Sequence, residues 1–581
     1  MRKFLPSLIV LSISLTMTFS SAFAQNQIEN PNNQRKPQQL SQEEADERRE
    51  IVRSIRENIG LFGEIYRQIS LRYVDKVNPE TFLKAGIDGM LATLDPYTEY
   101  IEPEGTDDIR IMSQGRYGGV GLQIGTRGSD RILTVISPME GTPAWRLGVR
   151  AGDQILEIDG ETTIGFTTSD AAQKLRGVPG EPVEIRVRRF GVDDLLDYTI
   201  VREEIMVKDV SFSGIIEPGI GYVRLTRFSR QANDEVREAI ENLVAQGMEG
   251  LIFDLRSNPG GLLPEAISVS ENFLHPGDPI VSTKGRSPEM DKEFFAENSP
   301  SLPDHIPLVI LVNEGSASAS EIVSGAVQDL DRGVVIGRTS FGKGLVQSVI
   351  NFRDNTALRI TTAKYYTPSG RLIQKVDYFS ENESIIADEE SAEEDSTFET
   401  TGGREMVAHG GIVPDIEVQQ PDVGELVIAL WRNDKYFDFT NVYMNENPDL
   451  DNWNLDESVY DEFLTYLDTS GFEFDSEAER RLSELREDSE QIGLGEAFLT
   501  ELEDLEKIAK DKKSEMYDDE KDDILRRLRL EVASALAGSA GRVSASLEHD
   551  PQIQKAIEVL KEEDLYNEML AGDLSAMEND K

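Results

Sequence analysis

The chain has 581 residues, of which 39% are hydrophobic, enough for about four domains with ordinary cores. Its 108 acidic and 59 basic residues give a formal net charge of −49, which argues against nucleic acid and anionic lipid as partners and fits a protein kept soluble in high salt. The absence of cysteine excludes disulfides, thiol catalysis and cysteine-based metal sites.

The first residues have the pattern of an export signal. Arg2 and Lys3 precede an apolar stretch, and Ala22 and Ala24 supply a small-x-small cleavage site. We predict a signal peptide over residues 1–24, cleaved after Ala24, and therefore a periplasmic or secreted protein. The alternative is an uncleaved anchor, which is disfavoured because the apolar stretch is short for a membrane span. Peripheral membrane association stays open.

The next two regions are a linker and a helical segment. Residues 25–40 are polar and of low complexity, as in a linker. Residues 41–110 are predicted to be helical, because Ser41 and Glu44 have capping-box spacing and apolar residues then recur every three or four positions. A second helix is expected before the turn-forming stretch LDPYTEY.

The pattern changes to short strands with frequent glycine over residues 111–205, with one helix near residues 169–177. Residues 206–424 alternate strands and helices, as in an α/β core, and residues 377–403 form an insertion with ten acidic and no basic residues. Residues 425–581 are predicted to be an acidic helical domain. The stripe Ile524, Leu528, Val532 and Leu536 is interpreted as packing within that domain.

Three motifs of the α/β region could carry chemistry: LRSNPGG at 255–261, SASASE at 316–321 and FGKG at 341–344. The turn after a strand can direct backbone amides at an oxyanion, and a buried lysine can be neutral enough to act as a base. Each motif alone is more often an ordinary turn. The residues alone do not decide among Ser316, Ser318 and Ser320 as a nucleophile. None of the four histidines has the spacing of a metal site or a triad.

Together the three motifs, in this order, closely resemble those of the C-terminal processing peptidases, also called tail-specific proteases. The resemblance covers roughly residues 50–420 and includes LDPYTEY, YYTPSGRLIQ and GGIVPD. It implies an α/β multidomain protein with a helical N-terminal segment, a PDZ domain, a peptidase core like those of ClpP and crotonase, and a helical C-terminal domain. Tyr97 of LDPYTEY stands where many relatives have histidine, and we interpret that stretch as structural.

The resemblance also implies a Ser-Lys dyad. The family nucleophile is the middle serine, which corresponds to Ser318, and the family base corresponds to Lys343. Gln347 would orient the lysine amine, and Ser320 would cap the following helix. The remaining implied residues are the oxyanion amides Gly260, Gly261 and Ala319, and the supporting acids Glu321 and Asp329.

The β-rich region resembles a PDZ domain through GGVGL and, about thirty residues later, GDQILEIDG. Such a domain binds a peptide's terminal carboxylate on backbone amides and adds the peptide as a strand. Arg176 would link tail binding to the dyad. The residues that would hold the tail are Gly119, Val120, Gly121 and Leu122.

The sequence thus predicts an exported serine endopeptidase that acts on proteins with apolar C-terminal tails and needs no metal or organic cofactor. The competing hypothesis is a non-catalytic PDZ scaffold or chaperone that keeps the fold without the activity. The C-terminal helices could bind a second copy of the chain or an adaptor protein.

Overall fold

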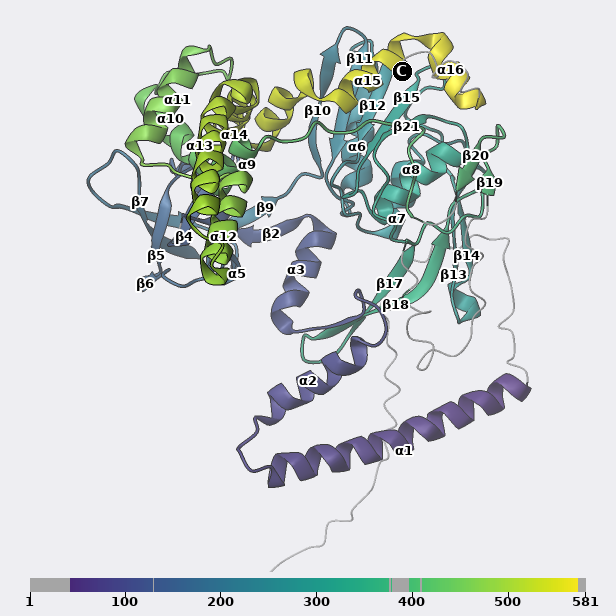
Figure 1. The fold of residues 1–581 in the computed structure, drawn as a ribbon. Helices are drawn as coiled ribbons and strands as arrows, with labels where there is room; N and C mark the ends of the chain where they lie inside the picture. The colour runs from purple at the N-terminus through teal and green to yellow at the C-terminus, as the bar shows by residue number, and fades with distance from the viewer. Residues whose placement is uncertain (1–41, 129, 376–377, 379–396, 408–409, 573–581) are drawn as a thin grey trace, which may run out of the picture. The chain divides into compact units, whose positions relative to one another are not determined.

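The computed structural model describes residues 42–128, 130–375, 378, 397–407 and 410–572. The predicted signal peptide, the linker and most of the acidic insertion lie outside these residues. The described residues include no helix long and apolar enough to span a bilayer. The chain divides into two compact units, Met1–Gly86 and Ile87–Lys581 (Figure 1).

The described part of the first unit consists of the predicted helices. They are α1 (Gln42–Arg72) and α2 (Pro79–Leu91), the second of which runs past the boundary of the unit. The ring of Tyr66 stacks on that of Phe82 at a centroid distance of 5.6 Å, and its hydroxyl donates to the carbonyl of Pro79. These contacts hold the two helices together.

The second unit begins with a turn, a short strand and a helix. Asp95 accepts hydrogen bonds from the backbone amides of Tyr97 and Thr98, which closes the LDPYTEY turn. The turn leads into β1 (Glu99–Ile101), which pairs with β18 (Ala357–Tyr366), and then into α3 (Pro103–Gln114).

The region predicted to be a PDZ domain is a six-stranded antiparallel sheet with a helix packed beside β3 and an additional β2–β9 pair. Alternate strand residues such as Val135, Ile155 and Ile185 are buried in its core. The elements are β2 (Arg116–Gly119), β3 (Leu122–Arg127), β4 (Ile132–Pro138), α4 (Pro143–Arg146), β5 (Gln154–Ile158), β6 (Glu161–Thr162), α5 (Thr168–Leu175), β7 (Pro182–Arg188), β8 (Leu196–Val201) and β9 (Glu203–Met206).

The predicted peptidase core has two sheets. The larger has the order β10-β11-β12-β15-β16-β21, parallel except for β10, and the smaller contains β1, β18, β13 and β14, with β17 paired to β18. The strands are β10 (Val210–Glu217), β11 (Ile220–Leu225), β12 (Gly250–Asp254), β13 (Pro279–Lys284), β14 (Lys292–Phe295), β15 (Leu308–Val312), β16 (Val334–Gly337), β17 (Leu345–Asn351), β18 (Ala357–Tyr366) and β21 (Ile416–Glu417). The helices are α6 (Ala232–Ala245), α7 (Leu263–Ser270) and α8 (Ala319–Asp329).

Different parts of the chain cover the two faces of the larger sheet (Figure 1). Residues such as Phe253 and Ile310 pack under α6, α7 and α8, whereas their neighbours Ile252 and Val309 pack against the last helices of the chain. Those helices are the end of α14 (Lys521–Ser546), α15 (Pro551–Lys561) and α16 (Glu563–Ala571). The C-terminal segment therefore completes the peptidase core.

The core also includes the end of the predicted acidic insertion. Strand β19 (Thr397–Glu399) pairs with β20 (Glu405–Val407), and the amide of Thr401 donates to the carbonyl of Asp329 at the end of α8. Residues 397–403 are thus packed on the core, which extends further into the insertion than the sequence predicts.

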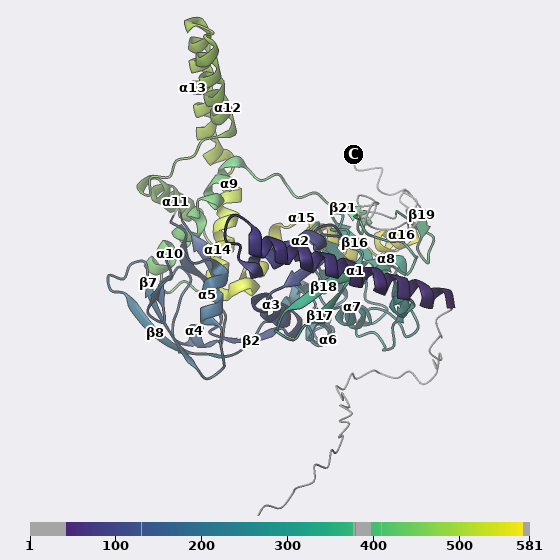
Figure 2. The same cartoon turned by 90° about the horizontal axis from the view of Figure 1, so that it is seen from below.

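The remaining C-terminal helices have a core of their own. Ile524, Leu528 and Val532 are buried in it and Leu536 packs against it, which confirms the predicted stripe. Helices α12 and α13 lie side by side as an antiparallel pair (Figure 2). The elements are α9 (Glu425–Arg432), α10 (Lys435–Glu446), α11 (Ser458–Thr469), α12 (Glu477–Ile492), α13 (Glu496–Asp519) and the first part of α14.

Candidate active site

Ser318 lies at the sharp turn between strand β15 and helix α8. Its backbone has φ of 55° and ψ of −110°, a conformation that costs an L-residue on the order of 1–3 kcal/mol. All five residues of β15 are buried, and so is all of α8, so the turn is fixed on both sides. Strain of this kind is typical of functional positions and presents the Ser318 side chain at the start of the helix.

The structure distinguishes the three serines of SASASE. Ser316 and Ser320 are fully buried, and their hydroxyls donate to the carbonyls of Leu255 and Asn258 in the LRSNPGG segment. Ser318, in contrast, is partly exposed. The predicted capping role of Ser320 is wrong, because α8 starts at Ala319 with Ser318 as its N-cap residue. Ser316 and Ser320 instead bind the motif that carries the predicted oxyanion amides.

Glu321 joins the serine turn to the lysine loop. Its buried carboxylate accepts hydrogen bonds from the backbone amide of Ser318 at 2.7 Å, from the hydroxyl of Ser340 at 2.6 Å and from the amides of Gly342 and Lys343 at 2.6 and 3.0 Å. Burial raises the pKa of Glu321, although these donors act in the opposite direction. Four donors directed at one carboxylate fix the spacing between the two loops.

A second tether comes from Tyr365 in β18. Its buried hydroxyl lies 3.1 Å from the carbonyl oxygen of Ser318 and within hydrogen-bond distance of the carbonyl of Lys343. The backbones of the two predicted dyad residues are therefore held by the same phenol and the same carboxylate.

Lys343 has a partly buried side chain. Burial lowers its pKa, and the nearby Arg359 guanidinium lowers it further, while Glu321 and Asp95 act in the opposite direction. Its Nζ lies over the ring of Tyr97, 4.4 Å from the centroid. A lowered pKa is what a general base needs near neutral pH.

Gln347 was predicted to orient the lysine amine but makes no hydrogen bond to it, and the predicted supporting acid Asp329 acts elsewhere in the core. Gln347 in β17 donates from Nε2 to Oγ1 of Thr361 at 3.4 Å, and no hydrogen bond joins it to Lys343. Asp329 lies at the far end of α8, where it pairs with the buried guanidinium of Arg371 at 2.6 Å. Asp329 therefore supports the fold around YYTPSGRLIQ.

The predicted oxyanion amides differ in whether a hydrogen bond within the protein already occupies them. The amide of Gly260 already donates to Oδ1 of Asn258 at 2.9 Å, whereas no hydrogen bond within the described residues occupies the amides of Gly261 and Ala319. Gly260 has φ of 96°, and a Cβ there would lie 2.9 Å from the nitrogen of Ala319. Glycine at 260 thus permits the close approach, and Gly261 with Ala319 is the pair left free to donate.

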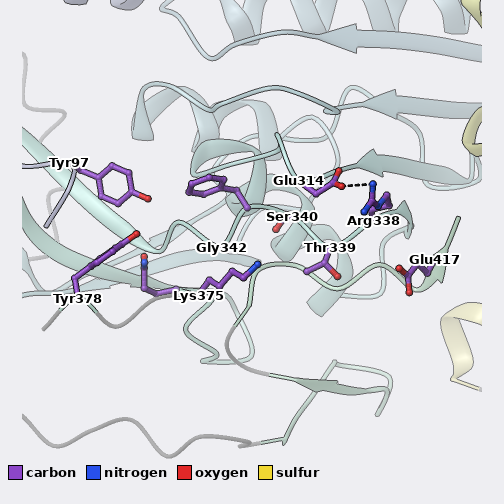
Figure 3. A pocket seen from close by; sticks show the side chains of 11 residues that line it. Tyr97, Glu314, Arg338, Thr339, Ser340, Gly342, Lys375, Tyr378 and Glu417 are labelled. Atoms are coloured by element: carbon purple, nitrogen blue, oxygen red, sulfur yellow. Dashed lines mark ion pairs between the residues drawn. The ribbon is translucent and has the colours of Figure 1, made fainter. Parts of the chain in front are cut away.

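A cavity of about 470 Å³ adjoins the lysine loop (Figure 3). Tyr97 and Tyr378 lie at one end of the view, the ion pair between Arg338 and Glu314 lies towards the other, and Lys375 extends between them. The cavity therefore offers an aromatic end and a charged end beside the predicted base. The other lining residues are Thr339, Ser340, Phe341, Gly342, Gln374 and Glu417.

Family models match each part of the chain. Peptidase family S41 matches residues 219–379, a PDZ domain matches 134–189, the C-terminal helical domain of a probable PDZ-protease matches 426–560, and the N-terminal domain of the activating protease CtpB matches 15–105. The chain is similar to the carboxy-terminal-processing protease of Bartonella bacilliformis, with 42% identity over 319 residues, 54% of this chain and 72% of the relative. The chain belongs to the C-terminal processing peptidase family.

Two other processing proteases are similar over 54% and 62% of this peptidase. The carboxy-terminal processing protease CtpA of Bacillus subtilis is 34% identical over 316 residues, 54% of this chain and 66% of the relative. Among solved structures, the photosystem II D1 C-terminal processing protease is 29% identical and covers 62% of this chain and 92% of its own, with a TM-score of 0.33. This peptidase is therefore a serine-type enzyme with a PDZ domain, as the sequence predicts.

In the PDZ domain of this peptidase, the predicted tail-binding loop runs from β2 into β3. Gly119 ends β2, Val120 is buried, and Leu122 begins β3, which has α5 packed beside it. Arg176 follows α5, pairs with Asp108 of α3 at 2.6 Å and lies over the ring of Tyr117. No contact joins Arg176 to Ser318 or Lys343, so its predicted link to the dyad is not direct.

The sequence did not indicate that two aromatic residues, Tyr365 and Tyr97, belong to the site. Tyr365 belongs to YYTPSGRLIQ and Tyr97 to LDPYTEY, both noted only as family motifs. The LDPYTEY stretch is predicted to be structural, but the ring of Tyr97 contacts the predicted base. No periodicity or spacing signals this contact, because 246 positions separate the turn from the lysine in the sequence.

Proposed function

We propose that this peptidase is exported and cleaves proteins with apolar, unstructured C-terminal tails by a Ser318–Lys343 acyl-enzyme mechanism. The observation that carries the proposal is the joint fixing of the two residues: Glu321 binds the amides of both, and the Tyr365 hydroxyl approaches the carbonyls of both. The lowered pKa of Lys343 supports its role as the base.

In the proposed first step, neutral Lys343 takes the hydroxyl proton of Ser318 as Oγ attacks the scissile carbonyl carbon. The oxyanion that forms is held by the amides of Gly261 and Ala319. The intermediate then collapses, the C–N bond breaks, and the lysine ammonium gives its proton to the leaving amine. Water next attacks the acyl-serine, losing a proton to Lys343, and the acid product leaves as Ser318 recovers its hydrogen.

Tail recognition is assigned to the loop around Gly119, Val120, Gly121 and Leu122. A peptide carboxylate would bind backbone amides there while the tail adds to β3 as a strand. Acidic tails are disfavoured because a net charge of −49 repels them, and the proposal therefore names apolar tails as the substrates.

One cleavage assay tests both parts. The substrate is an unstructured protein with an apolar tail whose C-terminus is either free or amidated. The enzymes are the mature chain, Ser318→Ala, Lys343→Ala and, as a matched control, Lys292→Ala on the exposed strand β14. We expect cleavage that needs Ser318 and Lys343, survives Lys292→Ala and prefers the free carboxylate.

Three other outcomes separate the parts of the proposal. Cleavage that ignores amidation removes the tail recognition and keeps the dyad. Undiminished cleavage by Ser318→Ala removes the dyad. Binding of the tail without any cutting across pH and salt favours the scaffold hypothesis.

Export is tested separately. Sequencing the N-terminus of the protein made in a bacterium with a signal peptidase should give Gln25, since the predicted cut follows Ala24. A mature protein that begins at Met1 in the cytoplasmic fraction would contradict export.

A further inference from the structure

We propose that Tyr97 is a positioning residue that holds the ammonium form of Lys343 on its ring in the resting enzyme, so that the lysine must leave the ring to serve as a base. The inference rests on the proposed role of Lys343 and adds a residue to that site.

The first step is the position of the amine. Nζ of Lys343 lies 4.4 Å from the centroid of the Tyr97 ring, well within the range of a cation–π contact. In the described part of the chain, Nζ makes no hydrogen bond and no ion pair. The ring face is therefore the direct favourable contact that the structure shows for this charge.

The second step is the rigidity of the ring's support. Asp95 accepts from the amides of Tyr97 and Thr98 at 2.9 Å and from the Thr98 hydroxyl at 2.8 Å. The Thr98 hydroxyl in turn accepts from the amide of Thr361 in β18. Strand β1 then pairs with the same strand, with Glu99 opposite Arg359. The LDPYTEY turn is thus fixed to the sheet that also carries Tyr365.

The third step concerns the charges around the amine. Asp95 from the turn and Glu321 from α8 favour the ammonium, and Arg359 from β18 disfavours it. Arg359 is itself paired with Glu99 at 2.8 Å. Lys375, Tyr378 and Tyr365 also belong to the surroundings, because the first two share the cavity wall with Tyr97 and the third approaches the Lys343 carbonyl.

These contacts oppose one another. Burial lowers the pKa of Lys343, whereas the electron-rich face of Tyr97 stabilises the charged form. Removing the ring while keeping an apolar side chain therefore lowers the lysine pKa. The Tyr97→Phe variant keeps the ring face and loses only the hydroxyl, so it is the matched control.

The test measures the ionisation of Lys343 without needing cleavage. Full-length Ser318→Ala protein, with Tyr, Phe, Leu or Met at position 97, is pulsed with acetic anhydride across pH, and acetylation of Lys343 is followed by peptide mass spectrometry. Acetylation of the exposed Lys292 in the same samples serves as the reference. We expect Tyr97→Leu and Tyr97→Met to shift the Lys343 profile roughly half to one pH unit towards acid, and Tyr97→Phe to leave it in place.

A second readout applies to the active chain. The acid limb of kcat/KM should move towards acid in Tyr97→Leu by the same amount, so that cleavage at low pH rises relative to the wild type. Thermal melts confirm that the variants are folded. An unchanged or raised lysine pKa in both Tyr97→Leu and Tyr97→Met, or an equal shift in Tyr97→Phe, would overturn the inference. Absence of cleavage in the wild type would instead overturn the proposed function, since the labelling result does not depend on it.

Discussion

The backbone of Ser318 shows how this peptidase stores strain at a single residue. A positive φ with ψ near −110° suits glycine, yet the position holds serine between a buried strand and a buried helix. Ser316 and Ser320 lie on either side without such strain and are bonded to the LRSNPGG segment. Local strain therefore marks Ser318 as the residue whose side chain is presented.

A residue at 318 that relieves this strain should raise the free energy of unfolding. We expect Ser318→Gly to be about 1 kcal/mol more stable than Ser318→Ala, because glycine adopts the observed φ without a steric cost. Urea unfolding of the two variants measures the difference. At Ser316, where φ is not positive, the glycine variant should be no more stable than the alanine variant. Equal stability of the two Ser318 variants would mean that the turn relaxes and holds no strain.

At the scale of elements, the peptidase core depends on helices from the end of the chain. Tyr222, Ile252 and Val309 form one face of the larger sheet, and α15 covers it with Ile553 and its neighbours. The N-terminus of α15 also reaches the site, since Asp550 accepts from the guanidinium of Arg256 at 2.7 Å. Arg256 lies in the same turn as the predicted oxyanion glycines.

This arrangement predicts a large stability effect from one residue of α15. Ile553→Ala removes a fully buried side chain and should lower the free energy of unfolding of the peptidase core by about 2–4 kcal/mol. Glu558→Ala, on the exposed side of the same helix, should change it by less than about 0.5 kcal/mol. Denaturant melts followed by tyrosine fluorescence and far-ultraviolet circular dichroism measure both, since Tyr222 and Tyr365 are buried in the core. If both variants change the free energy of unfolding by less than about 0.5 kcal/mol, the core does not depend on α15.

The strand and helix order of the core was predictable, because apolar runs, glycine turns and helical spacing are local signals. The spacing of SASASE and FGKG also led to Ser318 and Lys343 through the family resemblance. The packing of α15 on the larger sheet was not predictable. The apolar residues of this helix fit packing within the C-terminal helical domain equally well. The Tyr97 contact was likewise hidden, because it depends on pairing β1 with β18, far apart in the chain.

At the scale of the whole molecule, the excess of negative charge opposes the compact folded state. The formal net charge is −49 on 581 residues, so the acidic side chains repel one another. The described ion pairs offset this repulsion only locally. The pair between Arg127 of the PDZ domain and Asp434 beside α10 is one such contact across a domain boundary. Screening should therefore stabilise the folded state.

Salt should raise the melting temperature. We expect the Tm to increase steadily as NaCl rises from about 0.01 M to about 1 M, since the Debye length falls from about 30 Å to about 3 Å. Calorimetry at constant pH measures the trend. The variant Arg127→Gln, which removes one compensating charge, should show a larger gain with salt. A Tm that falls with NaCl would mean that attractive pairs outweigh the net repulsion.

The most direct test of the Ser318–Lys343 dyad is covalent labelling with a serine-directed fluorophosphonate, mapped by peptide mass spectrometry. We predict one label per chain, on Ser318 and neither on Ser316 nor on Ser320, absent in Ser318→Ala and strongly slowed in Lys343→Ala. A label on Ser316 or Ser320, or full labelling of Ser318 without the lysine, would contradict the proposed mechanism.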